Sequence, residues 1–260
     1  MAKKKPSRVQ SPHLAIYHFQ NELNSLRKQW LELLGCQPIP GWKPPDRIAE
    51  RLQRTLSKLH ATQKPEKDIA QACRQITAGG YLVGSALEWR QPILGNASSV
   101  SESRGAQWRL TVAWAGLETL VHSTIGGLNC KHLEHLTKIA DLEETIQRLP
   151  PPSPKMRNLQ QARQWPMTGD KPAMLEYIGI GKGFAPEMLS RWLYEGKPLA
   201  RAYEQLGLAQ SIRHATAHGA LSSSCLVSWG MRPALVPLTA TIAEACVGIF
   251  RALLRNPSPN

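Results

Sequence analysis

Residues 108–125 read WRLTVAWAGLETLVHSTI, and this stretch decides the fold class. Its apolar side chains return every three or four positions, the spacing that places them on one face of an α-helix. The pair Gly126-Gly127 follows and is typical of a helix end. The stretch therefore predicts a long helix from Trp108 to Ile125 whose broad apolar face must be buried against other elements. That face consists of Leu110, Val112, Ala113, Leu117, Leu120, Val121 and Ile125.

The rest of the chain shows the same helical spacing on both sides of this stretch. Helices are expected near 16–33, 46–59, 69–76, 81–90, 131–149, 187–194, 199–217 and 234–254. The pair Gly79-Gly80 is expected to end the third of them. Only Leu226 to Trp229 alternates in the manner of a short strand. The sequence therefore predicts an all-α protein.

A segment without helical periodicity lies between the two halves of the chain. Residues 92–104 are rich in Ser, Gly and Asn, which favours a loop and a domain boundary. We therefore expect a helical N-terminal region at 1–105, which binds RNA or a protein partner, and a helical bundle at 106–260. Residues 150–185 are rich in Pro and Gly and are expected to form a surface insertion in that bundle.

The chain is strongly basic. It has 260 residues, with 32 Lys and Arg against 19 Asp and Glu, and a formal net charge of +13. Both halves carry part of this excess, so the positive charge is not confined to a tail. Such a charge suits a phosphate-rich partner or an anionic membrane surface. Hydrophobic residues make up 42% and charged residues 20%, which disfavours wholesale disorder and a collagen-like repeat.

Cysteine usage and hydropathy point to the cytoplasm. The five cysteines are far apart, odd in number and without paired spacing, which is typical of reduced thiols. No apolar signal-peptide core follows the basic N-terminus. The most apolar stretch, Ala234 to Leu254, contains Pro237, Glu244 and Arg251, which favours a buried helix over a membrane span. We therefore expect a soluble cytoplasmic protein without a membrane partner.

Residues 211–219, SIRHATAHG, are the stretch that carries chemistry. His214 and His218 are four positions apart, which places them on neighbouring turns of one helix face. Arg213 lies about 100° around the helix axis from His214, but its long side chain can reach the same pocket. Arginine offers a fixed positive charge with five donors, and histidine exchanges a proton near neutral pH. These are the two components needed to cleave a phosphodiester without a metal.

Plainer interpretations exist for these residues. Cations near a helix C-terminus also favour the helix dipole, and Gly219 supplies a stop signal. A single Glu on an apolar helix, such as Glu118, is usually exposed or paired. Cys130, His132 and His135 lie close in sequence, but no second pair of ligands has zinc-site spacing. We therefore expect neither a metal nor another cofactor.

The six residues Arg213 to His218 resemble the R-x4-6-H motif of the HEPN superfamily, whose name stands for higher eukaryotes and prokaryotes nucleotide-binding. His214 fits the polar position after the arginine. Trp114 to Leu120 looks like the aromatic and Leu-Glu pattern of a first HEPN helix. Ala234 to Leu254 is similar to the long apolar helix that follows the motif. The resemblance covers about residues 106–255.

This resemblance implies a HEPN-like helical bundle that forms a homodimer with two copies of the motif facing one another. It implies a metal-independent endoribonuclease in which the 2′-hydroxyl of RNA attacks the adjacent phosphate. His218 would be the general acid or base and Arg213 would stabilise the developing charge, with His214 and Glu118 in support. A role in toxin–antitoxin or antiviral defence follows, with an antitoxin as a partner. The alternative is a noncatalytic HEPN-like RNA-binding or assembly module, such as an accessory subunit of a ribonucleoprotein complex.

Overall fold

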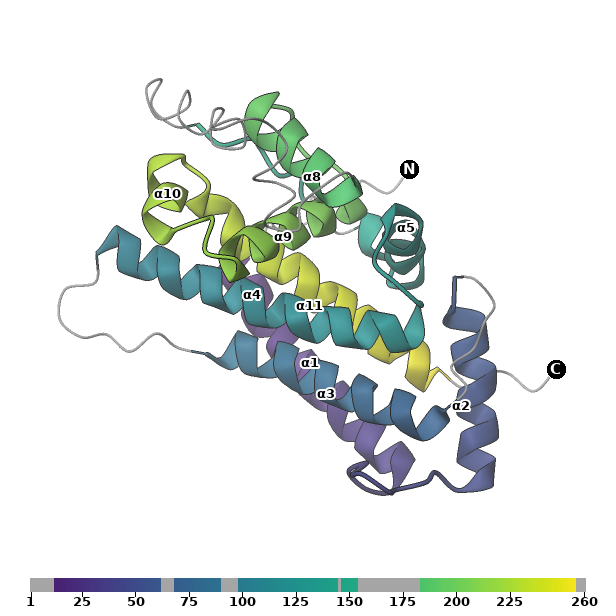
Figure 1. The fold of residues 1–260 in the computed structure, drawn as a ribbon. Coiled ribbons are helices and arrows are strands. Elements are labelled where there is room, and N and C mark those ends of the chain that lie inside the picture. Colours follow the sequence, from purple (N-terminus) through teal and green to yellow (C-terminus); the bar gives the residue numbers. More distant parts are fainter. Residues whose placement is uncertain (1–11, 62–67, 90–97, 145, 154–182, 256–260) are drawn as a thin grey trace, which may run out of the picture.

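The computed structural model describes residues 12–61, 68–89, 98–144, 146–153 and 183–255, and these are folded mainly as helices (Figure 1). The β-type pairing among them is one isolated bridge between Leu149 and Leu199. The all-α prediction is confirmed. Most of the insertion expected at 150–185 lies outside the described residues.

The helices follow the chain in two groups. The first group is α1 (Pro12–Leu34), α2 (Asp46–Leu59), α3 (Ile69–Glu88) and α4 (Ser99–Thr124). The second group is α5 (Cys130–Ile139), the 3-10 turn η1 (Leu142–Glu144), α8 (Phe184–Leu189), the π-helical turn η2 (Ser190–Tyr194), α9 (Ala202–Ala217), α10 (Ser223–Ser228) and α11 (Arg232–Leu254). In Figure 1, α4 runs between α3 on one side and α9 with α10 on the other.

α11 is the central helix of the bundle. It packs against α1, α4 and α9, and most of its side chains are buried. Ile242, Val247 and Phe250 are fully buried. α11 is long and apolar enough to cross a membrane, yet 78% of its apolar window is buried inside the protein. The stretch from Ala234 to Leu254 is thus the buried helix that its sequence indicates.

α3 and α4 cross at two glycines. A Cβ atom added at Gly79 would lie 2.7 Å from the carbonyl oxygen of Gly116, and one added at Gly116 would lie 2.7 Å from that of Gly79. A larger residue at either position would push the two backbones apart. The prediction that Gly79-Gly80 ends a helix is wrong, because α3 continues through both glycines to Glu88. The glycines serve close packing, with Gly80 set against the ring of Phe250.

α4 begins earlier than the sequence indicates. The hydroxyl of Ser98 accepts a hydrogen bond from the amide of Ser101, so residues 99–104 form the first turns of a helix rather than a loop. The boundary expected between residues 105 and 106 therefore falls inside α4. One hydrophobic core takes side chains from both sides of that boundary, such as Ile76 and Leu117.

The helix expected at 131–149 is shorter in the structure. α5 ends at Ile139, and Asp141 has a left-handed φ of 52°, which a continuous α-helix does not accommodate. The chain then forms η1 and an extended segment that pairs at Leu149. The alternating run from Leu226 is not a strand either, because its first three residues form the end of α10 and Trp229 caps that helix.

Replacing Gly116 with alanine is expected to destabilise the protein by about 1–3 kcal/mol, because the new methyl group overlaps the backbone of α3. At an open helical position the same exchange would be stabilising, since alanine has the higher helix propensity. Ser85→Ala, at an exposed position of α3, is the control and is expected to change stability by less than about 0.5 kcal/mol. Chemical denaturation followed by circular dichroism measures both variants. A Gly116→Ala protein as stable as the parent would contradict the close crossing.

Candidate functional site

The motif lies at the C-terminal end of α9. His218 is the residue after the helix, and its amide donates to the carbonyl oxygen of His214 over 3.0 Å. Gly219 has a left-handed φ of 72°, and the amide of Leu221 donates to the carbonyl oxygen of Ala215 over 3.0 Å. This turn ends the helix and leaves His218 exposed at the surface.

Arg213 joins α9 to α4. Its Nη2 atom lies 3.2 Å from Oε2 of Glu118, and the two side chains are only 24% and 28% exposed. Partial burial reduces the screening of this ion pair by water. The Nη1 atom of Arg213 lies 3.4 Å from Nδ1 of His214. Arg213 is therefore held in place by one residue on each of the two helices.

His214 is held in its neutral form. Burial lowers its pKa below the ordinary value of 6.5, and the charges of Arg213 and His218 also lower it, while Glu118 acts in the opposite direction. Because arginine has only donors, Nδ1 of His214 accepts from Arg213, and the ring proton is assigned to Nε2. His214 therefore presents a neutral N–H donor.

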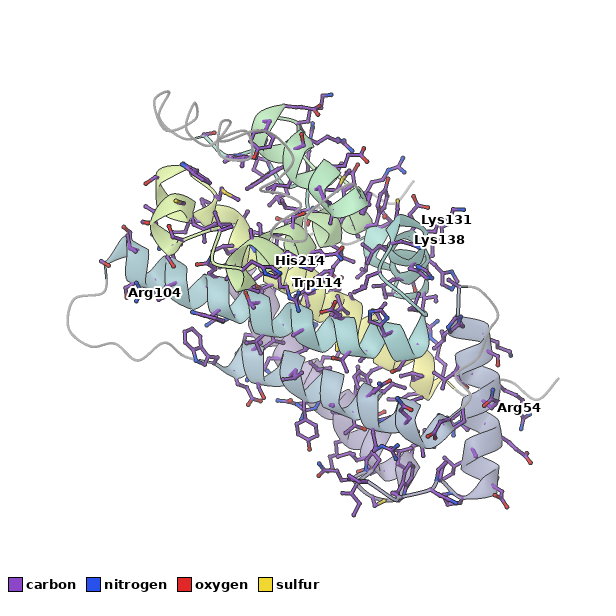
Figure 2. All side chains as sticks on the ribbon, viewed as in Figure 1. Arg54, Arg104, Trp114, Lys131, Lys138 and His214 are labelled. Atoms are coloured by element: carbon purple, nitrogen blue, oxygen red, sulfur yellow. The ribbon has the colours of Figure 1, made fainter. Side chains whose placement is uncertain are left out.

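The two histidines of the motif stand side by side. Their ring centroids are 6.3 Å apart and their ring planes differ by 8°. The four-residue spacing predicted this shared face, and the long side chain of Arg213 reaches it as expected. The structure thus brings together Arg213, His214, His218 and Glu118. In Figure 2, His214 lies over the middle of α4, against which α9 packs.

This arrangement combines a positive charge, a neutral donor and an exposed imidazole. A guanidinium carries five N–H groups, so Arg213 keeps donors beyond those that face Glu118 and His214. An anion that approaches His218 would therefore meet donors from two neighbouring residues. Glu118 offsets part of the charge of Arg213, which is a more specific part than the supporting role expected from the resemblance.

A buried glutamine outside every motif of the sequence fixes the end of the Arg213–His218 motif. Nε2 of Gln107 donates to Oγ1 of Thr216 and to the carbonyl oxygen of Leu221, each over 2.7 Å. Its Oε1 atom accepts from the hydroxyl of Ser223 over 2.9 Å. One amide therefore ties α4 to the last turn of α9, to the following loop and to α10. In the sequence, Gln107 precedes the apolar Leu110 by one helical turn and so shares its buried face. A polar side chain on such a face needs hydrogen-bond partners, and this position is the signal that could have identified Gln107.

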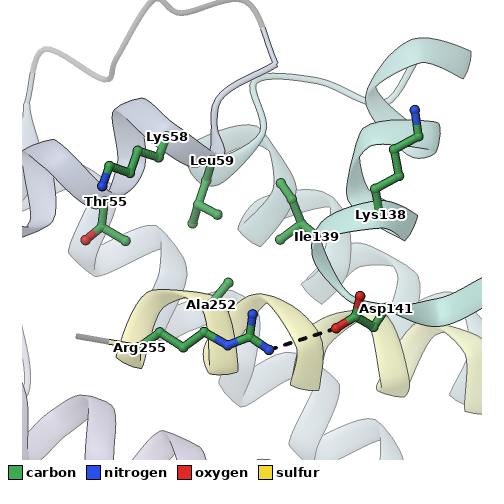
Figure 3. Close-up of a pocket in the computed structure, with 8 residues that line it drawn as sticks. All are labelled: Thr55, Lys58, Leu59, Lys138, Ile139, Asp141, Ala252 and Arg255. Atoms are coloured by element: carbon green, nitrogen blue, oxygen red, sulfur yellow. Dashed lines mark ion pairs between the residues drawn. The ribbon is translucent and has the colours of Figure 1, made fainter. Parts of the chain in front are cut away.

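A pocket of about 320 Å³ lies away from the motif, where α2, α5 and α11 meet (Figure 3). Arg255 reaches toward Asp141 there, with 3.9 Å between Nη2 and Oδ2. In the part of the chain that the structure describes, no group of three or more His, Cys, Asp or Glu side chains is arranged to hold a metal ion. The pocket is lined by Thr55, Lys58, Leu59, Lys138, Ile139, Asp141, Ala252 and Arg255.

Comparisons with protein-family models, with curated proteins and with solved structures find no match for this chain. The resemblance to the HEPN superfamily therefore rests on the residues of the motif and on the helices around it.

Removing the charge of Arg213 with Arg213→Gln is expected to raise the pKa of His214 toward 6.5, and Glu118→Gln is expected to lower it. Arg54→Gln, on α2, is the control and is expected to leave it unchanged. NMR titration of the imidazole signals measures all three. Because the pKa of His214 is lowered by folding, its contribution to stability is present above pH 6.5 and is lost as the pH falls through the folded-state value. Equal His214 titration curves in all variants would contradict the contacts described here.

Proposed function

We propose that this chain is a metal-independent endoribonuclease of HEPN type. The observation that carries the proposal is that Arg213, anchored to Glu118, lies beside the neutral His214 and the exposed His218 on one surface. A fixed cation with spare donors and an accessible imidazole are the groups that metal-free phosphodiester cleavage requires. The order of α4, α9 and α11 along the chain, and their packing against one another, fit the resemblance of the motif.

In the proposed reaction the 2′-oxygen of a ribose bonds to the adjacent phosphorus, and the bond from phosphorus to the 5′-oxygen breaks. One imidazole takes the proton of the 2′-hydroxyl, and an acid gives a proton to the departing 5′-oxygen. The products are a 2′,3′-cyclic phosphate and a 5′-hydroxyl. Arg213 stabilises the negative charge that develops on the phosphorane, and His214 donates its Nε2–H to a phosphate oxygen.

Two proton transfers call for two copies of the site. His218 is exposed, so a second copy of the chain can bring the partner subunit's His218 to the same phosphate. We therefore propose a homodimer with a composite site, in which one His218 acts as base and the other as acid. RNA is the substrate because the attacking group is the 2′-hydroxyl, which DNA lacks. A cytoplasmic role in toxin–antitoxin or antiviral defence, with an antitoxin as partner, is part of this proposal.

A specific observation favours a second candidate, a noncatalytic RNA-binding or assembly module of the same family. The carboxylate of Glu118 already pairs with Arg213. His214 lies in the last turn of α9 and His218 follows it as the C-cap, where cations favour the helix dipole. In that case Arg213 and His218 hold phosphate without cleaving it.

The purified protein is expected to cleave labelled RNA in the presence of EDTA, and His218→Ala is expected to lower the rate by about 100-fold or more, because the proton-transfer group is lost. His18→Ala, at an exposed position of α1, is the matched control and is expected to retain full activity. Gel electrophoresis of the products measures the rates. A DNA oligonucleotide of the corresponding sequence, which lacks the 2′-hydroxyl groups, is expected to stay intact. Cleavage that survives His218→Ala, or that needs an added metal, would overturn the proposed mechanism.

Mixing the parent protein with an equal amount of His218→Ala is expected to lower the rate below the half that independent subunits would give. If one composite site needs His218 from both subunits, only the dimers with two parent subunits stay active after random exchange, so the mixture reaches about a quarter of the parent rate. The control is the parent protein mixed with His18→Ala, which is expected to keep the full rate. A mixture at half of the parent rate, with subunit exchange shown by mass spectrometry, would rule out the shared site.

A further inference from the structure

Two tryptophans are exposed, one at the C-cap of α3 and the other in the third turn of α4. Trp89 is 37% exposed and Trp108 is 52% exposed, whereas Trp30, Trp114 and Trp192 are fully buried. Nη2 of Arg109 donates to the carbonyl oxygen of Trp89 over 2.8 Å, which brings the end of α3 next to residues 108 and 109 of α4. Two large aromatic side chains exposed on adjoining helix segments are typical of a contact surface.

A cation accompanies these rings. Arg104 is exposed and lies one helical turn before Trp108, so the two side chains share a face of α4. Among the described residues, Arg104 takes part in no ion pair. The nearby carboxylates are already engaged, since Glu102 pairs with Arg232 and Glu88 accepts from the amide of Asn24 over 3.1 Å. The surface therefore offers aromatic faces together with an unpaired positive charge.

The same helix leads from this surface to the motif. Trp108 and Glu118 are ten positions apart on α4, which is about 15 Å along the helix axis. Thr111 and Ala115 lie between them and are partly exposed, so accessible side chains continue from one end to the other. Figure 2 shows Arg104 near the N-terminal end of α4, and His214 of α9 over a point farther along α4.

We propose that Trp89, Trp108 and Arg104, here named the α4 platform, bind single-stranded RNA and lead it toward the motif. This inference rests on the proposed function only in taking RNA as the partner. Bases stack on exposed aromatic rings without regard to their identity, and an arginine beside the rings pairs with the backbone phosphate. The unpaired charge of Arg104 favours a polyanion over a second copy of the same basic chain as the occupant.

The test uses the full chain and a fluorescein-labelled 2′-O-methyl oligouridylate of about 12 nucleotides, which binds as a single strand and cannot be cleaved. Trp108→Ala is expected to raise the Kd by about tenfold, and Trp108→Phe is expected to recover most of the affinity, because the stacking face is restored. Arg104→Gln is expected to reduce the slope of log Kd against log salt by about 1. Tyr17→Ala, an exposed aromatic position on α1, is the control and is expected to bind as the parent does.

The experiment distinguishes failure of the platform proposal from failure of the nuclease proposal. Unchanged affinity in Trp108→Ala would overturn the platform, even if the parent protein cuts RNA through His218. Tryptophan-dependent binding in a protein that never cuts RNA would support the platform and overturn the nuclease. Light scattering on the same samples tests whether a second copy of the chain, rather than RNA, occupies the platform. A change of oligomeric state in Trp108→Ala would show that the surface joins two copies of the chain, and it would overturn the proposal.

Discussion

The close crossing of α3 and α4 is the constraint on which the rest of the structure depends. Gly79 and Gly116 leave no side chain between the two backbones, so α3 occupies one face of α4. Glu118 follows Gly116 by two positions and therefore lies about 200° around the helix axis. The contact that seats α3 thus turns Glu118 toward α9. A bulkier residue at Gly116 would disturb both the core and the orientation of the carboxylate that holds Arg213.

Two polar residues on this second face of α4 give the motif its geometry. Gln107 and Glu118 are eleven positions apart, just over three full turns, so both face α9 from points about 16.5 Å apart along the axis. Gln107 holds the turn that ends α9, and Glu118 holds Arg213. A favourable interaction with the helix dipole needs only a cation near the C-terminus. It does not require Arg213 to pair with a residue on another helix. The ion pair of Arg213 with Glu118 therefore favours a functional site over a role in helix capping alone.

The spacing of apolar residues along the chain predicts the helices. The features that it does not predict arise from contacts between residues that are far apart in the sequence. Some predictions concern a single face of a single helix, and the structure has these features as predicted. They are the apolar faces of 108–125 and 234–254 and the shared face of His214 and His218. Gly79-Gly80 has a local tendency to end a helix, which the packing of α4 overrides. The polar residues after 97 suit a loop and a helix N-terminus equally, so the cap at Ser98 has no distinct signal. Arg213 and Glu118 are 95 positions apart, and no periodicity links them.

The pairing of Arg213 with Glu118 also separates two roles of the positive charge. A compensated arginine beside a neutral His214 adds little net charge. In the proposed function, the long-range attraction of RNA therefore comes from the other basic residues that make up the net charge of +13, including Arg104. What the motif retains is a set of donors fixed in direction. A phosphodiester carries one negative charge, and the phosphorane formed from it carries more. In the proposed reaction, donors held in place without a large net charge would bind the ground state weakly and respond to the added charge of the transition state. That is the condition for catalysis rather than for tight binding.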